Sequence, residues 1–318
     1  MKIFYRIIDK EIEIVRCFGD SPEVVLPAQI DDLPVTKAAP YAFSDRKHEE
    51  EKDVLVCEVD SGLLSAEEHL LAGPAVESIS FPDTVREIGN YIFYGCKRLE
   101  RLEFYNTLLQ VGSGAFTGCG GLKKLQVHML HGNKSCVKEI LGDLWQRMDI
   151  TFYYEETGKC AQLVFPEHYE EAVENTPARI LFTQHHGSGN NYRQCFYEKE
   201  MDYHKYDSLF YIAEARDQIK NLMDIAFGRL LYPYELGGTE KEQYCRMIVE
   251  RYKDILPVLI KEERFEEIKM ITEFPSWNEE MLDLALDLTV REKKAELSGF
   301  LMSKKEKSTK KKRKRFEL

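Results

Sequence analysis

The stretch Phe81-Pro-Asp-Thr-Val-Arg-Glu-Ile-Gly-Asn-Tyr-Ile-Phe-Tyr-Gly-Cys-Lys-Arg-Leu-Glu-Arg-Leu-Glu103 decides the fold, because its pattern begins again at Phe104. Identical or similar residues then recur at one constant spacing, in the pairs Ile88–Val111, Gly89–Gly112, Phe93–Phe116, Gly95–Gly118, Cys96–Cys119, Leu99–Leu122, Leu102–Leu125 and Phe104–Val127. A repeat of this length predicts a solenoid, in which each coil buries its apolar face against its neighbours.

Earlier copies of the pattern precede Phe81. One aligns Val35 with Val85, Tyr41 with Tyr91 and Phe43 with Phe93. A degenerate copy aligns Val76, Ile79 and Phe81 with Leu99, Leu102 and Phe104 at the same spacing as the clear repeats. We therefore predict about four coils, with the polar residues 44–53 as an insertion. A hairpin of strands 4–8 and 11–15 around Asp9-Lys10 is expected to open the array.

Each coil contains a short strand whose apolar residues point inward, so the residues between them point to solvent together. The candidate binding surface is this exposed ladder, in which Ser78, Arg101 and Lys124 share one repeat position and Ser80, Glu103 and Gln126 share another. Cys96 and Cys119 also share a repeat position. We interpret both as reduced core thiols rather than as a disulfide.

The coils resemble BspA-like leucine-rich repeats. The matching residues are Pro82, Val85, Ile88, Gly89, Phe93, Gly95, Cys96 and Leu99 in one coil and Val111, Gly112, Ala115, Phe116, Gly118, Cys119 and Leu122 in the next. The resemblance covers about residues 1–130 and implies a leucine-rich-repeat solenoid. Many members of that family are secreted and adhesive. Because residues 1–6 alternate apolar and charged side chains instead of forming a signal peptide, we expect a cytoplasmic protein here.

The rest of the chain is not leucine-rich. Residues 131–205 are predicted as an α/β capping and connecting segment, with helices at 135–148 and 167–175 and strands at 149–155, 160–165 and 179–183. Part of this segment is similar to a region that accompanies intracellular bacterial proteins of this repeat type. Residues 206–303 have helical spacing and end in two similar helical hairpins, in which Leu256 aligns with Ala285 and which look weakly ankyrin-like. The expected fold class is α+β: a short leucine-rich-repeat solenoid, a small mixed segment and a helical-hairpin domain.

The charge of the chain is unevenly distributed. Its net charge is −11, yet residues 304–318 contain nine Lys and Arg against two Glu, which leaves a net charge of −18 for the remainder. We expect residues 304–318 to be a disordered basic tail, since like charges repel. An acidic body repels phosphate, so nucleic acid could bind through this tail alone. With no apolar window of about 18 residues, the sequence predicts no membrane span.

Two groups of residues suggest chemistry. The string from His185 to Asn191 surrounds Ser188 with glycines but lacks the Gly-x-Ser-x-Gly spacing of a nucleophile elbow, so we interpret it as a loop. A pairing of Cys195 with His185 or His186 is a further alternative, although a buried cysteine is the simpler interpretation. His128, His131 and Cys136 are zinc-ligand types without a fourth partner, and we interpret them as polar residues that cap the solenoid.

Our leading hypothesis is a non-catalytic protein–protein interaction scaffold or adaptor in the bacterial cytoplasm, with a protein partner, no metal and no cofactor. The alternatives are a hydrolase-like enzyme that uses the His186/Ser188/Cys195 region, and nucleic-acid association through the basic tail.

Overall fold

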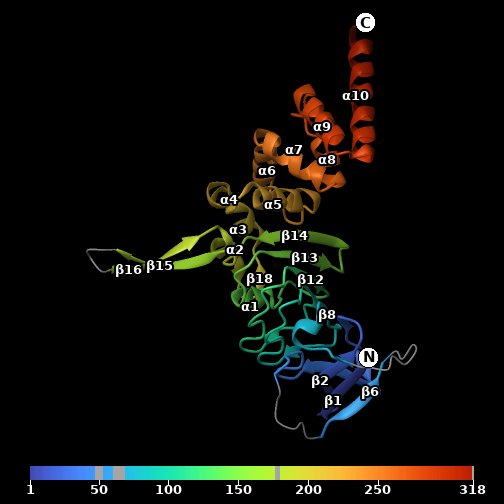
Figure 1. Cartoon of the computed structure of the whole chain (residues 1–318), viewed down its shortest axis with the longest axis vertical. Coiled ribbons are helices and arrows are strands. Elements are labelled where there is room, and N and C mark those ends of the chain that lie inside the picture. The colour runs from blue at the N-terminus through green and yellow to red at the C-terminus, as the bar shows by residue number, and fades with distance from the viewer. Residues whose placement is uncertain (47–52, 60–68, 176–179, 317–318) are drawn as a thin grey trace. The chain divides into compact units, whose positions relative to one another are not determined.

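The computed structural model describes residues 1–46, 53–59, 69–175 and 180–316, with 173–175, 180–185 and 307–316 at the level of the backbone only. The chain forms two compact units, Met1–Arg216 and Asp217–Leu318. Figure 1 shows the strands gathered in the first unit and the helices α5 to α10 in the second. No helix in the described part combines the length and apolar composition that crossing a bilayer requires.

An antiparallel hairpin opens unit 1. β1 (Lys2–Ile8) and β2 (Glu11–Gly19) pair around Asp9-Lys10, as the sequence predicted. Both turn residues have positive φ, 51° at Asp9 and 64° at Lys10. Hairpin turns of this type favour Asn-Gly, because a side chain with a Cβ is strained at positive φ.

Replacing the turn by Asp9→Asn with Lys10→Gly is expected to raise the free energy of unfolding of unit 1 by about 0.5–1 kcal/mol. Urea denaturation followed by circular dichroism measures the change. Lys10→Ala keeps the Cβ and serves as the control, with an expected effect below about 0.5 kcal/mol. An equal or lower stability of the Asn-Gly variant would contradict the assigned turn.

The repeats form two sheets. In the first, which we call the repeat sheet, β14 (Lys159–Phe165), β13 (Met148–Tyr154), β12 (Lys124–Met129), β10 (Arg101–Tyr105), β8 (Ser78–Ser80) and β3 (Glu23–Val25) lie in that order. Its strands are parallel from β3 to β13, and β14 returns antiparallel. The pairing of Ser78 with Arg101 and of Arg101 with Lys124 confirms the register of the predicted repeat.

The second sheet includes the opening hairpin. Its strand order is β11 (Gln110–Val111), β9 (Glu87–Ile88), β5 (Leu33–Ala38), β2, β1 and β6 (Leu55–Glu58). Two short strands pair beside this order: β4 (Gln29–Ile30) pairs with β5, and β7 (His69–Leu70) pairs with β2. Lys37 pairs with Glu87 and Ala38 with Ile88, which confirms the alignment that placed Val35 on Val85.

Phenylalanine side chains fill the space between coils. The ring centroids of Phe43 and Phe93 are 5.7 Å apart and those of Phe93 and Phe116 are 5.3 Å apart, with all three residues at most 1% exposed. Cys96 and Cys119 are buried free thiols, as expected. They donate to the carbonyl oxygens of Phe43 and Phe93, at 3.2 and 3.1 Å. The shared repeat positions therefore define a continuous core.

The repeated glycines allow the coils to stack closely. A Cβ on Gly89 would lie 2.3 Å from the backbone nitrogen of Pro40, and one on Gly112 would lie 2.3 Å from that of Asn90. Real side chains do not approach backbone this closely, so each coil presses directly on the backbone of the preceding one.

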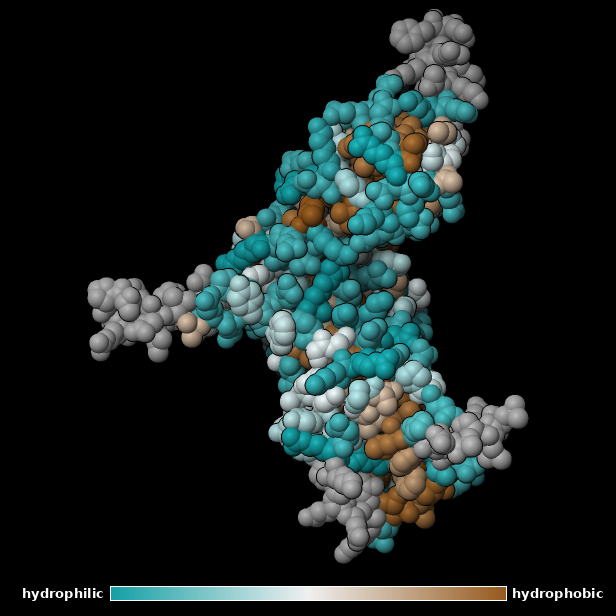
Figure 2. Space-filling view, in the orientation of Figure 1, coloured by the Kyte–Doolittle hydropathy of each residue, from teal (hydrophilic) through white to brown (hydrophobic). Residues whose placement is uncertain are grey.

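The predicted insertion at 44–53 includes residues 47–52, which lie outside the described residues. After it, β6 pairs antiparallel with β1, and a 3₁₀ turn (η1, Gly73–Ala75) leads back to β8. Exposed aliphatic side chains gather over this N-terminal sheet, where Figure 2 shows a brown area beside the grey atoms; they include Ile7, Ile8, Leu55 and Val56.

Two helix predictions in the following segment were wrong. The expected helix at 135–148 is limited to α1 (Val137–Gly142), because Met148 already begins β13. The expected helix at 167–175 is a strand, β15 (Tyr169–Asn175), which pairs antiparallel with β16 (Ile180–His186). Its Tyr169 and Val173 are residue types that suit a strand once a partner supplies backbone hydrogen bonds, whereas local propensity alone suggested a helix. The strand pair β13–β14 and the strand β16 were predicted and are present.

Short elements complete unit 1. They are α2 (Gly189–Tyr192), β17 (Phe196–Tyr197), β18 (Glu200–Met201), α3 (Tyr203–Ser208) and α4 (Phe210–Arg216). The run of consecutive helices thus starts with α3 at Tyr203, near the expected boundary at 206. The repeat sheet itself continues through β13 and β14 across the boundary that we had placed after residue 130.

Unit 2 is helical, as predicted. It contains α5 (Ile219–Leu231), α6 (Gly238–Glu250), α7 (Tyr252–Lys261), α8 (Phe265–Ile271), α9 (Glu279–Arg291) and α10 (Ala295–Phe316). The turns after α7 and α9 are equivalent: Glu263 and Lys293 have positive φ, and the amides of Arg264 and Lys294 donate to Leu259 and Thr289. Each turn closes its helix with the same C-cap motif.

These turns align Glu263 with Lys293, so Leu256 corresponds to Leu286 instead of the predicted Ala285. The C-cap geometry fixes the register of the two hairpins where the apolar pattern was ambiguous. The backbone of the basic tail is helical through Phe316, where we had expected disorder. Lys, Arg and Glu are good helix formers, so the backbone of α10 can continue into a segment that has no apolar face.

Candidate functional site

The outward side chains of the repeat sheet form three rows that cross its strands. The first row, which we call the charged row, consists of Glu23, Ser78, Arg101, Lys124 and Asp149. The second consists of Val25, Ser80, Glu103, Gln126 and Thr151. The third, the aromatic row, consists of Tyr105, His128 and Tyr153. We call these three rows together the repeat face. Each row uses equivalent strand positions, so the solenoid presents them as one continuous grid.

The structure brings all six predicted ladder residues onto this grid. Ser78, Arg101 and Lys124 are cross-strand neighbours, as are Ser80, Glu103 and Gln126. The expectation that all six face solvent was wrong for Ser78, which is only 8% exposed. The Arg101 guanidinium reaches back over it, 3.4 Å from the Ser78 hydroxyl and 3.8 Å from a carboxylate oxygen of Glu23.

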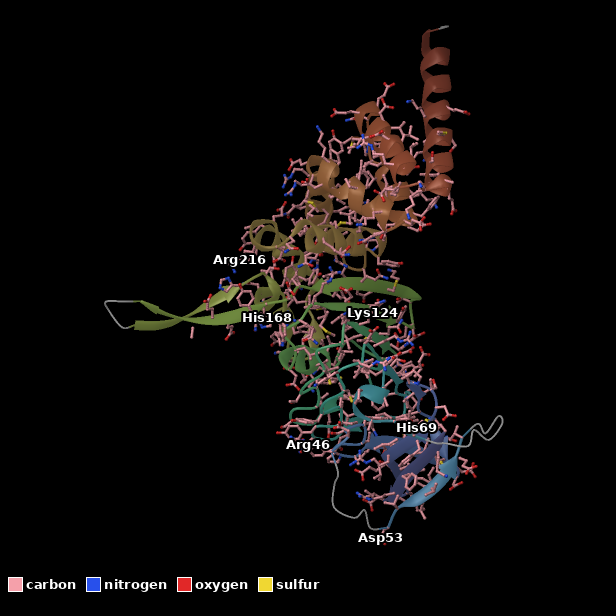
Figure 3. All side chains as sticks on the ribbon, viewed as in Figure 1. Arg46, Asp53, His69, Lys124, His168 and Arg216 are labelled. Atoms are coloured by element: carbon pink, nitrogen blue, oxygen red, sulfur yellow. The ribbon has the colours of Figure 1, made fainter. Side chains whose placement is uncertain are left out.

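The charged row borders a small hollow of about 190 Å³, and Figure 3 labels Lys124 on this row. The lining residues are Glu23, Glu77, Ser78, Glu100, Arg101, Lys123 and Lys124. Arg98 forms an ion pair with Glu77. This end of the sheet therefore contains both signs of charge, and its arginines already have internal partners.

The aromatic row was missed by the sequence reasoning. The rings stack across three neighbouring strands: the centroids of Tyr105 and His128 are 4.7 Å apart and those of His128 and Tyr153 are 5.1 Å apart. A usable signal was present, because Tyr105 and His128 share one repeat position, and each stands two places after a ladder residue, Glu103 or Gln126. We had interpreted His128 as a capping residue.

Two carboxylates from different coils bracket the central imidazole. The Nε2 atom of His128 lies 3.0 Å from Glu103, and its Nδ1 atom lies 2.7 Å from Glu155. The Gln126 amide donates to the Tyr153 hydroxyl at 3.3 Å. Burial raises the pKa of the Tyr105 hydroxyl, and the negative charges of Asp83, Glu155 and Glu103 raise it further. This end of the repeat face is consequently acidic.

The three zinc-ligand types have separate surroundings. His131 is exposed and lies 3.1 Å from Glu156, whereas Cys136 is fully buried, and burial raises the pKa of its thiol. Within the described residues, no group of three or more His, Cys, Asp or Glu side chains is placed to hold a metal ion.

The alternative catalytic region is arranged for packing. Ser188 and Cys195 are both fully buried. The ring of His186 stacks on Tyr169 at 4.3 Å, and its Nε2 atom lies 3.2 Å from Glu171. The side chain of His185 lies outside the described residues. Burial raises the pKa of the Cys195 thiol to about 12, which disfavours the thiolate that nucleophilic attack requires.

Thiol labelling tests this description. At pH 8 the buried cysteines, whose pKa values are raised to about 12 in Cys17, Cys96 and Cys195, should remain protonated and unlabelled by iodoacetamide in the native chain. Labelling should begin at the half-buried thiols Cys57, Cys160 and Cys245. Peptide mass spectrometry identifies the sites, and the urea-unfolded chain provides the control with all eight labelled. Rapid native labelling of Cys195 would instead indicate a reactive thiol.

Comparison with known proteins agrees with the repeat architecture. Residues 67–138 match the family model described as "BspA type Leucine rich repeat region (6 copies)". Together with the strand registers, this match shows that the chain contains a BspA-type leucine-rich-repeat region. The match covers the later coils and does not include the opening hairpin, the first coil with β3 and β5, most of the mixed segment or unit 2.

The search of solved structures matches this chain to bacterial leucine-rich-repeat proteins. One from Bacteroides capillosus is 20% identical, with 39% of this chain and 76% of that one covered and a TM-score of 0.29. A leucine rich cell surface protein from Faecalibacterium prausnitzii is 21% identical, with 40% and 30% covered and a TM-score of 0.27. The leucine-rich-repeat protein of T. pallidum is 23% identical, with 38% and 67% covered and a TM-score of 0.23. A search of curated proteins finds no match.

Proposed function

We propose that this protein is a non-catalytic interaction scaffold of the bacterial cytoplasm that binds a protein partner through its repeat face. The observation that supports the proposal most directly is the continuous grid of outward side chains on β3, β8, β10, β12 and β13. A largely polar surface that continues across several strands suits contact with another protein surface, as in other repeat proteins.

The cytoplasmic setting is part of the same proposal. All eight cysteines are free thiols, including Cys96 and Cys119 at one repeat position in adjacent coils. Proteins of oxidising compartments commonly pair their cysteines, so this usage favours a reducing environment. One of the matched structures is that of a cell surface protein. Fractionation of cells that make this protein would distinguish a cytoplasmic from a cell-surface location.

Charge reversal on the charged row tests the binding proposal. Full-length chain with Arg101→Glu and Lys124→Glu should lose its partner in a pull-down from those cells, with affinity at least tenfold lower, because like charges placed in an interface cost several kcal/mol. The control is Lys241→Glu with Arg246→Glu, which makes the same charge change on α6 in unit 2. Equal recovery of every partner by the charged-row variant and the wild type would contradict the proposal.

A further inference from the structure

The two ends of the repeat face differ in the balance of their charges. In and beside the charged row, Arg98 pairs with Glu77, and Arg147 lies 2.9 Å from Asp149. Beside the aromatic row, the carboxylates of Glu103 and Glu155 both contact the His128 imidazole. Even a fully protonated His128 leaves this group with a net charge of −1. The aromatic end of the face therefore has an excess of negative charge.

The carboxylates are accessible and lie beside polarisable rings. The side chains of Glu103 and Glu155 are 34% and 46% exposed, and that of His128 is 19% exposed. The raised pKa of Tyr105, due first to burial and then to Asp83, Glu155 and Glu103, agrees with a negative potential at its hydroxyl. Guanidinium and ammonium groups are favoured where a carboxylate and an aromatic ring are presented together.

We infer that the segment which binds the repeat face is basic and places an arginine or lysine side chain at Glu103 and Glu155, beside Tyr105 and Tyr153. This inference rests on the proposed function and specifies the chemistry of the partner. The charged row contains both signs of charge, with Arg101 near Glu23 and Arg147 near Asp149, so the attraction for a basic segment is centred on the aromatic end of the face.

The experiment uses the full chain and short fluorescein-labelled peptides with three Arg residues separated by Gly and Ser, followed by fluorescence anisotropy. A matched peptide with Gln in place of Arg measures contacts that do not depend on charge. Glu103→Gln with Glu155→Gln should weaken binding of the Arg peptide by about fivefold or more, the size expected for losing a charge pair of about 1 kcal/mol. Glu235→Gln with Glu250→Gln changes the net charge equally in unit 2 and should alter it by less than about twofold.

Three outcomes would overturn the inference: equal effects of the two double variants, equal binding of the Arg and Gln peptides, or no binding of the Arg peptide to the wild type. Circular dichroism verifies folding, and Glu155→Gln alone, in the exposed turn after β13, provides a milder variant that should show a partial loss. These outcomes leave the proposed function intact if the charged-row variant still loses its partner. If the proposed function itself is wrong, the charged-row variant should instead recover its partner as well as the wild type does.

Discussion

Replacing Phe93 by alanine is expected to destabilise unit 1 by about 3–5 kcal/mol, the usual cost of removing a buried phenylalanine. Phe93 is fully buried and contacts the rings of both neighbouring coils, so its loss leaves Phe43 and Phe116 without their common partner. Because a solenoid coil is stable only against its neighbours, the effect should spread along the repeat sheet.

Hydrogen exchange measured by mass spectrometry locates the effect of Phe93→Ala. Peptides from β10 and β12 should lose protection by roughly 100-fold or more, as about 3 kcal/mol implies, while peptides from α7 and α9 keep theirs. Tyr197→Ala removes an aromatic ring that is 76% exposed and should change protection little. Equal loss of protection in both variants would show that the phenylalanine stack does not support the coils.

The second large effect is expected at Arg193, which ties the mixed segment together. Its guanidinium donates to the carbonyl oxygens of Leu144, Gln146, Pro166 and Gly189 over 2.7–3.1 Å. Burial lowers its pKa to about 10, so it remains charged at neutral pH. Arg193→Met leaves four carbonyl groups without their shared donor and should cost about 3 kcal/mol or more.

Arg193→Lys separates charge from geometry. Lysine retains the positive charge but cannot span four acceptors with a planar fork, so we expect an intermediate loss of stability. Urea denaturation together with hydrogen exchange of the peptides around α1 and α2 measures both variants. Wild-type stability in Arg193→Met would contradict the structural role of this residue.

The repeat region could be predicted from the sequence because identical side chains recur at fixed spacing. Phe93 and Phe116, or Cys96 and Cys119, have the same neighbours in each coil, so one alignment gives both the register and the core. The outward ladder followed from the two-residue alternation of a strand. The same alternation reaches Tyr105 and His128, but the aromatic row was missed because His128 was considered only as a zinc ligand or as a residue that caps the solenoid.

Outside the repeats, local pattern was a weaker guide. The residues of β15 have mixed propensity, and pairing with β16 decides their conformation. Arg193 was not recognised because three of its four acceptors, the carbonyl oxygens of Leu144, Gln146 and Pro166, lie 49, 47 and 27 residues away in the sequence. In unit 2 the helices were recognisable, but the offset between the hairpins depended on the positive φ of Glu263 and Lys293, which the apolar spacing does not specify.

The most direct test of the account is photo-crosslinking from the centre of the repeat face. A photo-reactive amino acid replaces Gln126 in the full chain, and the control chain has it at Val290, which is 66% exposed in unit 2. In cells that make this protein, the Gln126 position should give a defined protein adduct. An excess of unlabelled wild-type chain should compete for the partner and abolish that adduct. The same excess of the Arg101→Glu, Lys124→Glu chain should leave the adduct in place. The same adducts from Val290, or equal competition by both chains, would contradict the assignment of the repeat face as the binding surface.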